Sequence, residues 1–124
     1  MKELFFHQKN PISIPVPGTI LVQEHFGKSA NQNTNVSIAH LIVPGGWSEP
    51  YQTPEFDEYT IMIRGKKILE VNGEKITVVA GESILISKGT RVQYSNPFPE
   101  EAEFWAICTP AFSIDLANRE SFWN

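Results

Sequence analysis

Short runs of alternating hydrophobic and polar residues recur along the whole chain, and glycine, proline or asparagine separates most of them. Alternation with a period of two is typical of strands that bury only one face. The pattern predicts strands at Thr19–Phe26, Asn35–Val43, Glu58–Arg64, Lys66–Asn72, Glu74–Val79, Ser83–Ser87, Arg91–Asn96 and Ala102–Thr109.

The turn signals between these runs are strong. Asn72-Gly73 separates two strand patterns, and both residues accept the positive φ that a type I′ hairpin requires. The alternating residues of the Ile12–Val16 segment are interrupted by prolines, which cannot donate to a sheet ladder. That segment is therefore expected to be an edge strand or an extended arm.

Helical patterns are scarce. Only Ser113–Ser121 is expected to form a short helix, and the polar stretch Ser29–Asn35 is expected to be a loop. Many short strands at even spacing favour an all-β fold, either a closed barrel or a sandwich, because closure removes exposed sheet edges.

Length and charge limit the classes of function. The 124 residues fit one domain, and the net charge of −4 without any basic cluster argues against nucleic acid or an anionic membrane as a partner. The single Cys108 allows no internal disulfide and no CxxC site, which favours a reducing, cytoplasmic environment. Residues 1–10 lack the apolar core of a signal peptide, and no apolar run is long enough for a membrane span.

Two motifs resemble those of the cupins. The segment Gly46–Gly65 reads GWSEPYQTPEFDEYTIMIRG, and its Glu58 and Gly65 match the end of the first cupin motif. The segment Gly81–Asn96 reads GESILISKGTRVQYSN, and its first Gly, Gly89 and Asn96 match the second motif. The resemblance spans residues 44–110, which we take as the core of a single domain covering 1–124, with 1–18 as an N-terminal arm.

This resemblance implies an antiparallel double-stranded β-helix, the jelly-roll barrel of the RmlC-like superfamily. It also implies a small barrel that commonly forms homodimers, and we expect the arm or the outer sheet face at the interface. The segments around Asp57-Glu58 and Ile86–Thr90 are similar to those of EutQ-type cupins, which are poor in metal ligands.

The departures from the cupin pattern concern the metal ligands. Gln52 and Pro54 (or Glu55, if the spacing shifts) stand where the first motif has its two histidines, and Val92 replaces the histidine of the second motif. Valine offers no lone pair, and an amide oxygen is a weak ligand. We therefore expect no cofactor and no usual cupin metal site. A weak divalent site of His40, Gln52 and Glu58 is the alternative.

Alternation indicates which side chains enter the barrel. If Glu58 points inward, as its motif position implies, then Thr60 and Met62 do so as well. Val92, Tyr94 and Asn96 would share the inner face of the later strand. The expected ligand-binding residues are Gln52, Glu58, Met62, Val92 and Tyr94, and His40 on the preceding strand is a candidate to complete the set.

Two functions remain open at this point. The first is a binding module that holds a small polar metabolite inside the barrel. The second is an enzyme that uses Glu58, His40 and Tyr94 as catalytic residues, either for acid–base isomerase or lyase chemistry or for an acetate kinase activity of the EutQ type. The kinase version lacks any phosphate-binding glycine-rich loop with Lys and Ser/Thr.

Overall fold

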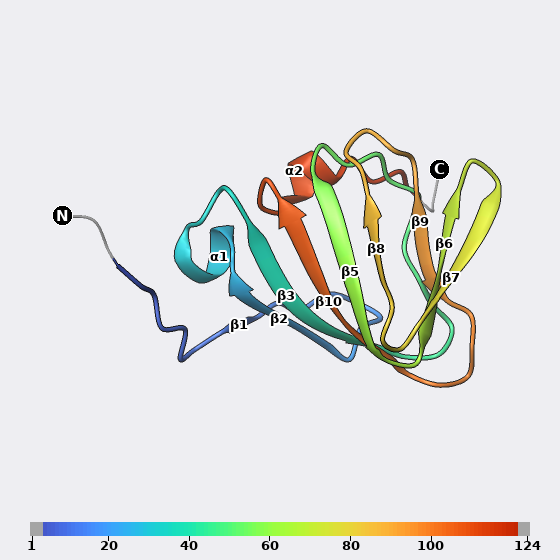
Figure 1. The fold of residues 1–124 in the computed structure, drawn as a ribbon, viewed down its shortest axis with the longest axis horizontal. Coiled ribbons are helices and arrows are strands. Elements are labelled where there is room, and N and C mark those ends of the chain that lie inside the picture. The colour runs from blue at the N-terminus through green and yellow to red at the C-terminus, as the bar shows by residue number, and fades with distance from the viewer. Residues whose placement is uncertain (1–3, 122–124) are drawn as a thin grey trace.

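A computed structural model describes residues 4–121, and Figure 1 shows its course. The chain is built from strands and two one-turn helices. The strands are β1 (Ile12–Ser13), β2 (Leu21–Phe26), β3 (Ser37–Val43), β4 (Trp47–Ser48), β5 (Asp57–Arg64), β6 (Lys66–Val71), β7 (Glu74–Val79), β8 (Ser83–Ile86), β9 (Gln93–Asn96) and β10 (Ala102–Thr109); the helices are α1 (Lys28–Asn31) and α2 (Ile114–Ala117).

The strands form two antiparallel sheets. The six-stranded sheet has the order β1-β2-β3-β10-β5-β8, and the four-stranded sheet has the order β4-β9-β6-β7. Figure 1 shows the first sheet running from β1 to β8, with β9, β6 and β7 of the second beside it. From β3 to β10 the chain passes back and forth between the two sheets, apart from the β6–β7 hairpin within the second sheet, which is the double-stranded β-helix arrangement. The predicted all-β fold is confirmed.

The predicted turn at Asn72-Gly73 joins β6 to β7. Its two residues have φ values of 52° and 77°, and Val71 pairs with Glu74 across the turn. Asparagine and glycine tolerate this left-handed region at the least cost. The type I′ hairpin expected from the sequence is confirmed.

The main hydrophobic core lies between the two sheets. Both sheets contribute residues that are almost completely buried, as alternation requires. The buried members are Val43, Trp47, Met62, Leu69, Val78, Ile86, Val92, Tyr94, Ala102 and Phe104. A smaller cluster of Phe56, Cys108 and Ala117 packs under α2.

The first strand and the last helix agree with the sequence-based predictions in part. Ile12–Ser13 pairs with β2 as the edge strand of its sheet, as predicted. Helix α2 lies within the predicted helical range, and the Ser113 hydroxyl accepts a hydrogen bond from the Leu116 amide. Within residues 4–121, no helix is long and apolar enough to cross a membrane.

The expected loop at Ser29–Asn35 contains a short helix, α1, that the sequence did not predict. The buried carboxylate of Glu24 accepts hydrogen bonds from the amides of Ser29 and Ala30, at 3.0 and 2.8 Å. Gly27 permits this approach, because a Cβ there would lie 2.6 Å from the Glu24 carboxyl carbon. A tertiary contact from β2 therefore stabilises a turn with weak local helix propensity.

Candidate functional site

Strand β5 directs Glu58 into the barrel. Thr60 and Met62, on the same face, are each only 1% exposed, whereas Tyr59 and Ile61 on the other face are about 40% exposed. Glu58 is partly accessible and pairs with Cys108 of β10 and with Ile86 of β8. The inward face predicted for Glu58, Thr60 and Met62 is the one that the structure has.

The carboxyl group of Glu58 has a strongly raised pKa. Burial raises its pKa to about 7, and the charge of Glu49 also raises it. The charges of Lys67 and Arg119 and a hydrogen bond with the Cys108 thiol act in the opposite direction. A carboxyl group in this state exchanges protons near neutral pH, which suits acid–base chemistry.

Lys67 of β6 is the residue that the sequence analysis missed. Its side chain is 1% exposed, and its ammonium nitrogen lies 3.7 Å from the ring centre of Phe104 and 4.5 Å from that of Tyr94. Burial lowers the Lys67 pKa to about 8, although the charge of Glu58 opposes this shift. Alternation with the buried Leu69 was the signal that could have identified it.

Two buried hydroxyl groups lie in the same interior without a partner. The Thr60 Oγ1 and Tyr94 Oη atoms have no hydrogen-bond partner among the described residues. Tyr94 is 2% exposed and shares the inner face of its strand with Val92 and Asn96, as predicted. An unpartnered buried hydroxyl is costly, so these two atoms are the unsatisfied polar groups of the candidate site.

Gln52 lies where the C-terminal segment meets the barrel. It is 2% exposed and forms isolated bridges with Val92 on one side and Arg119 on the other. The Arg119 guanidinium donates to the Gln52 Oε1 atom at 3.1 Å and to a Glu49 carboxylate oxygen at 3.2 Å. Arg119 could not be identified from the sequence, because its contact partners are about 70 residues away along the chain.

His40 lies on the outer face of the six-stranded sheet, so the inference that it completes the interior set is wrong. Its neighbours Leu41 and Val43 contact the core, whereas its own ring stacks on Trp105, with ring centres 4.9 Å apart. The His40 Nε2 atom lies 2.7 Å from a Glu103 carboxylate oxygen. The structure therefore brings Glu58 and Tyr94 to one interior but not His40, and the weak metal site of His40, Gln52 and Glu58 is not assembled.

The interior donors do not fit the metal centre that the cupin resemblance implies. Among residues 4–121, no group of three His, Cys, Asp or Glu side chains lies close enough to hold a metal ion. The Gln52 amide oxygen already accepts a hydrogen bond from Arg119, and Val92 has no donor atom. The buried cation of Lys67 would also repel a divalent ion nearby.

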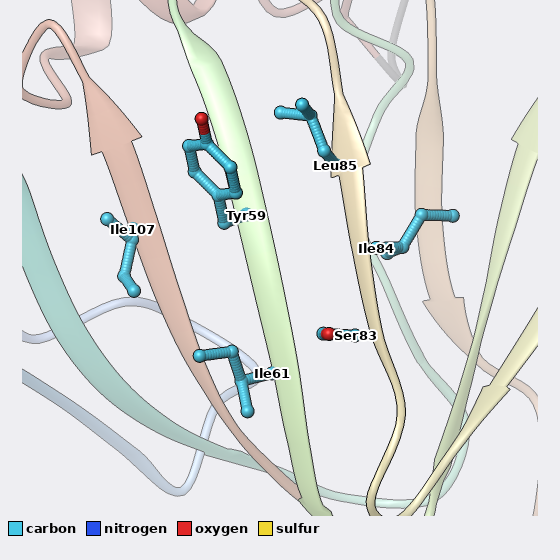
Figure 2. A pocket seen from close by; sticks show the side chains of 6 residues that line it. All are labelled: Tyr59, Ile61, Ser83, Ile84, Leu85 and Ile107. Carbon is cyan, nitrogen blue, oxygen red and sulfur yellow. The ribbon is translucent and has the colours of Figure 1, made fainter.

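A separate depression lies on the outer face of the six-stranded sheet, with a volume of about 420 Å³. It is lined by Tyr59, Ile61, Ser83, Ile84, Leu85 and Ile107, which are shown in Figure 2. Tyr59, Ile61 and Leu85 are each 39–46% exposed, and Ile63 on the same face of β5 is 49% exposed. We call these four residues, together with Ile107, the outer apolar face.

The family comparison agrees with the fold and the motifs. Residues 39–109 match the Cupin_2 family, described as a cupin domain. This match covers more than half of the chain, and the protein therefore belongs to the cupin family.

Individual relatives place the chain among small cupin barrels. The EutQ protein of Clostridium difficile superposes with a TM-score of 0.61 at 22% identity, over 75% of this chain and 69% of that one. An RmlC-like cupin from Shewanella frigidimarina superposes with a TM-score of 0.70 at 14% identity, over 89% of this chain and 93% of its own. At these identities the likeness shows the fold alone.

One curated protein is more similar in sequence. The chain is 37% identical over 100 residues to a Myxococcus xanthus protein named endoribonuclease YbeY. That alignment covers 81% of this chain but only 34% of the Myxococcus protein. The chain thus spans about a third of the length of this relative.

Proposed function

We propose that this cupin binds a small polar metabolite inside the barrel, between Glu58 and Lys67, without a metal ion. The observation that carries the proposal is the pair of unpartnered, buried hydroxyl groups of Thr60 and Tyr94 in the same interior as these two ionisable side chains. A few convergent polar groups on apolar walls are the usual composition of a small-molecule site.

The cost of burying Lys67 supports this proposal. A buried ammonium group is strongly destabilising unless it is compensated, and the aromatic rings around it compensate only in part. No ion pair within 4 Å joins Lys67 to a carboxylate in the part of the chain that the structure describes. A ligand oxygen that accepts hydrogen bonds from Lys67, Thr60 and Tyr94 would supply the missing compensation.

Ligand-dependent thermal stabilisation tests this function. The protein is screened against a panel of small metabolites and divalent metals, and the panel is repeated with Glu58→Gln and Lys67→Met. We expect at least one polar metabolite to raise the melting temperature of the unmodified protein and of the exposed control Glu74→Gln, but not of the two interior variants. A panel without any stabilising metabolite, or hits that persist in both interior variants, would contradict the proposal.

An acid–base enzyme is the second candidate function. The pKa of Glu58, raised to about 7 by burial, favours it, because a group that titrates near neutral pH can both accept and donate a proton. Tyr94 is the second candidate catalytic group, whereas His40 stacks on Trp105 at the outer face of the sheet and takes no part. Turnover of a stabilising metabolite would support the enzyme, and stabilisation without turnover would support the binding module.

The outer apolar face supports the proposal of a homodimer. Its exposed side chains come from β5 and β8, and the half-buried Ile107 of β10 lines the same depression (Figure 2). Leu4 and Phe5 of the N-terminal arm, which Figure 1 shows extending away from the barrel, are 93% and 82% exposed. A second copy of the chain would cover both apolar elements, since a monomer gains nothing from exposing them.

A further inference from the structure

We propose that Lys67 is a nucleophilic amine that forms a reversible imine with a small, uncharged hydroxyaldehyde bound beside Glu58. This inference rests on the proposed binding function and adds to it the substrate class and the bond that forms. It gives the buried lysine a chemical role, in addition to its contacts with the aromatic rings.

The surroundings of Lys67 favour a neutral amine. The amine is in contact with the rings of Phe104 and Tyr94, and the Trp47 ring centre lies 5.9 Å away. The apolar interior lowers its pKa to about 8, so an appreciable fraction is neutral near physiological pH. Desolvation in an apolar pocket is one of the established ways in which proteins activate a lysine as a nucleophile.

The register of β5 against β10 places the remaining groups in order along the barrel. Met62 pairs with Phe104, against which the amine lies, whereas Glu58 pairs with Cys108, four residues further along β10. Thr60 lies between Met62 and Glu58, and its hydroxyl has no partner among the described residues. The interior thus presents an amine, an unpartnered hydroxyl and a carboxyl group in succession.

This order matches the steps of imine formation. The neutral Lys67 amine adds to the carbonyl carbon, a C–N bond forms, and the π electron pair moves to the oxygen. A proton passes from the nitrogen to this oxygen, which gives a carbinolamine. The protonated carboxyl group of Glu58 then donates its proton to the hydroxyl, which leaves as water, while the nitrogen lone pair forms the C=N bond. The products are a protonated imine, water and the Glu58 carboxylate, and addition of water reverses the sequence.

The charges around the site favour an uncharged substrate over a keto acid. Arg119 is the other cation near Glu58, and its guanidinium is already bound to Glu49 and Gln52. Lys67 itself is consumed as the nucleophile, so among residues 4–121 neither of the two cations that act on Glu58 is left to bind a substrate carboxylate. The hydroxyl groups of Thr60 and Tyr94 instead suit the hydroxyl and carbonyl oxygens of a small hydroxyaldehyde.

Reductive trapping tests the inference on the full chain. The protein is incubated with glycolaldehyde and sodium cyanoborohydride at neutral pH, and adducts are assigned to individual lysines by tandem mass spectrometry. We expect Lys67, although 1% exposed, to be modified faster than its exposed neighbour Lys66. Glu58→Gln should slow modification of Lys67 at least about tenfold and leave Lys66 unchanged, because general acid catalysis is lost.

The outcomes separate this inference from the proposed function. Lys66→Arg, the matched control next to the site, should leave modification of Lys67 unchanged. Modification of Lys67 no faster than of Lys66 in the unmodified protein would overturn the imine, and this comparison requires no variant to fold. If glycolaldehyde or another metabolite still stabilises the protein through Glu58, the binding function stands while the imine fails. If nothing on the panel stabilises it, the binding function itself fails.

Discussion

Glu58 and Lys67 extend into the barrel from opposite sheets, and the charge of each stabilises the charged form of the other. Burial has the contrary effect on both groups and is the larger influence. It raises the pKa of Glu58 to about 7 and lowers that of Lys67 to about 8. Near neutral pH, therefore, a small change in pH alters the charge of Glu58 or of Lys67. The stability of the protein and its binding of a polar ligand should both depend on pH for this reason.

The first prediction concerns stability in mildly acidic solution. Glu58 ionises near pH 4.5 in the unfolded chain but near pH 7 in the folded protein. Its contribution to stability is thus complete below pH 4.5 and is lost as the pH rises towards 7. Relative to Glu58→Gln, the free energy of unfolding should fall by up to about 1.4 kcal/mol per pH unit in this range. Urea denaturation from pH 4.5 to 8 measures it, and parallel curves for the two proteins would contradict it.

The second prediction concerns stability in alkaline solution, where Lys67 should make the free energy of unfolding rise with pH. Its pKa is 10.5 in the unfolded chain and about 8 in the folded protein, so the unfolded state holds more protons between these values. Stability should therefore rise with pH from 8 to 10.5 relative to Lys67→Met, which lacks the titrating group. Lys66→Met serves as the control on the same strand and should keep the rise.

Replacing Lys67 should also change the pKa of Glu58. Because the Lys67 charge lowers the Glu58 pKa, Lys67→Met should move that pKa above 7. A titration of the Glu58 side-chain carbon by NMR measures this shift directly. An unchanged or lower pKa in the variant would show that the two groups are not coupled.

Arg119 connects the C-terminal segment to the barrel through hydrogen bonds to Gln52 and Glu49. Arg119→Ala removes the hydrogen bonds to Gln52 and Glu49 and should destabilise the protein by roughly 1–2 kcal/mol, since both partners are largely buried. The variant should also raise the pKa of Glu58, because the Arg119 charge lowers it. Arg91→Ala, which breaks the exposed pair with Glu120, is the comparison and should leave the Glu58 titration unchanged.

The strands could be predicted from the sequence because their physical cause is local. Alternation of apolar residues, the Asn72-Gly73 turn and the prolines of the arm each act over a few residues, and the structure has the corresponding strands. Helix α1 could not be predicted, because its stabilising group, the Glu24 carboxylate, comes from β2. Strand β4, with only two residues, depends on its pairing with β9 rather than on its own sequence.

The direction of a candidate site residue could be predicted only where a cupin motif fixes the face of its strand. Glu58, Met62, Val92 and Tyr94 are found on the inner side of the barrel, and Gln52 lies where the C-terminal segment meets it. His40 has no motif position, and the alternation of β3 was assigned to the wrong face because Ile38 and Ile42 are as apolar as Leu41 and Val43. Lys67 was missed because a lysine is rarely buried, so only its neighbour Leu69 indicates its direction.

Assembly is tested on the outer apolar face. Ile61→Lys places a charge at the centre of this face and should convert the proposed homodimer into monomers, because the charge would be desolvated at the interface. Val79→Lys, at a site on β7 of the other sheet with the same 40% exposure, is the matched control and should stay dimeric. Sedimentation equilibrium measures both, and a mass near 14.0 kDa for the unmodified chain would contradict the dimer.

The next prediction concerns the metal content of the protein. Protein purified without chelator should carry much less than one transition metal per chain, and EDTA should hardly change its melting temperature. The reason lies in the donors: Val92 offers no lone pair, and the Gln52 oxygen is bound to a guanidinium group. About one tightly held Fe, Mn, Ni or Zn per chain would contradict this prediction.

A variant with histidines at the two cupin motif positions should gain the metal site that this protein lacks the donors to form. Gln52 and Val92 face each other in an antiparallel bridge, so Gln52→His combined with Val92→His places two imidazoles on neighbouring backbone segments. Glu58, the acid of the first cupin motif, is the candidate third donor. Zinc binding needs about three good donors, which this variant would supply. We expect it to gain zinc-dependent stability of about 2.7 kcal/mol at a metal concentration 100 times its dissociation constant, and to lose this stability with EDTA. Equal EDTA sensitivity of the unmodified protein would show that its own residues already hold a metal.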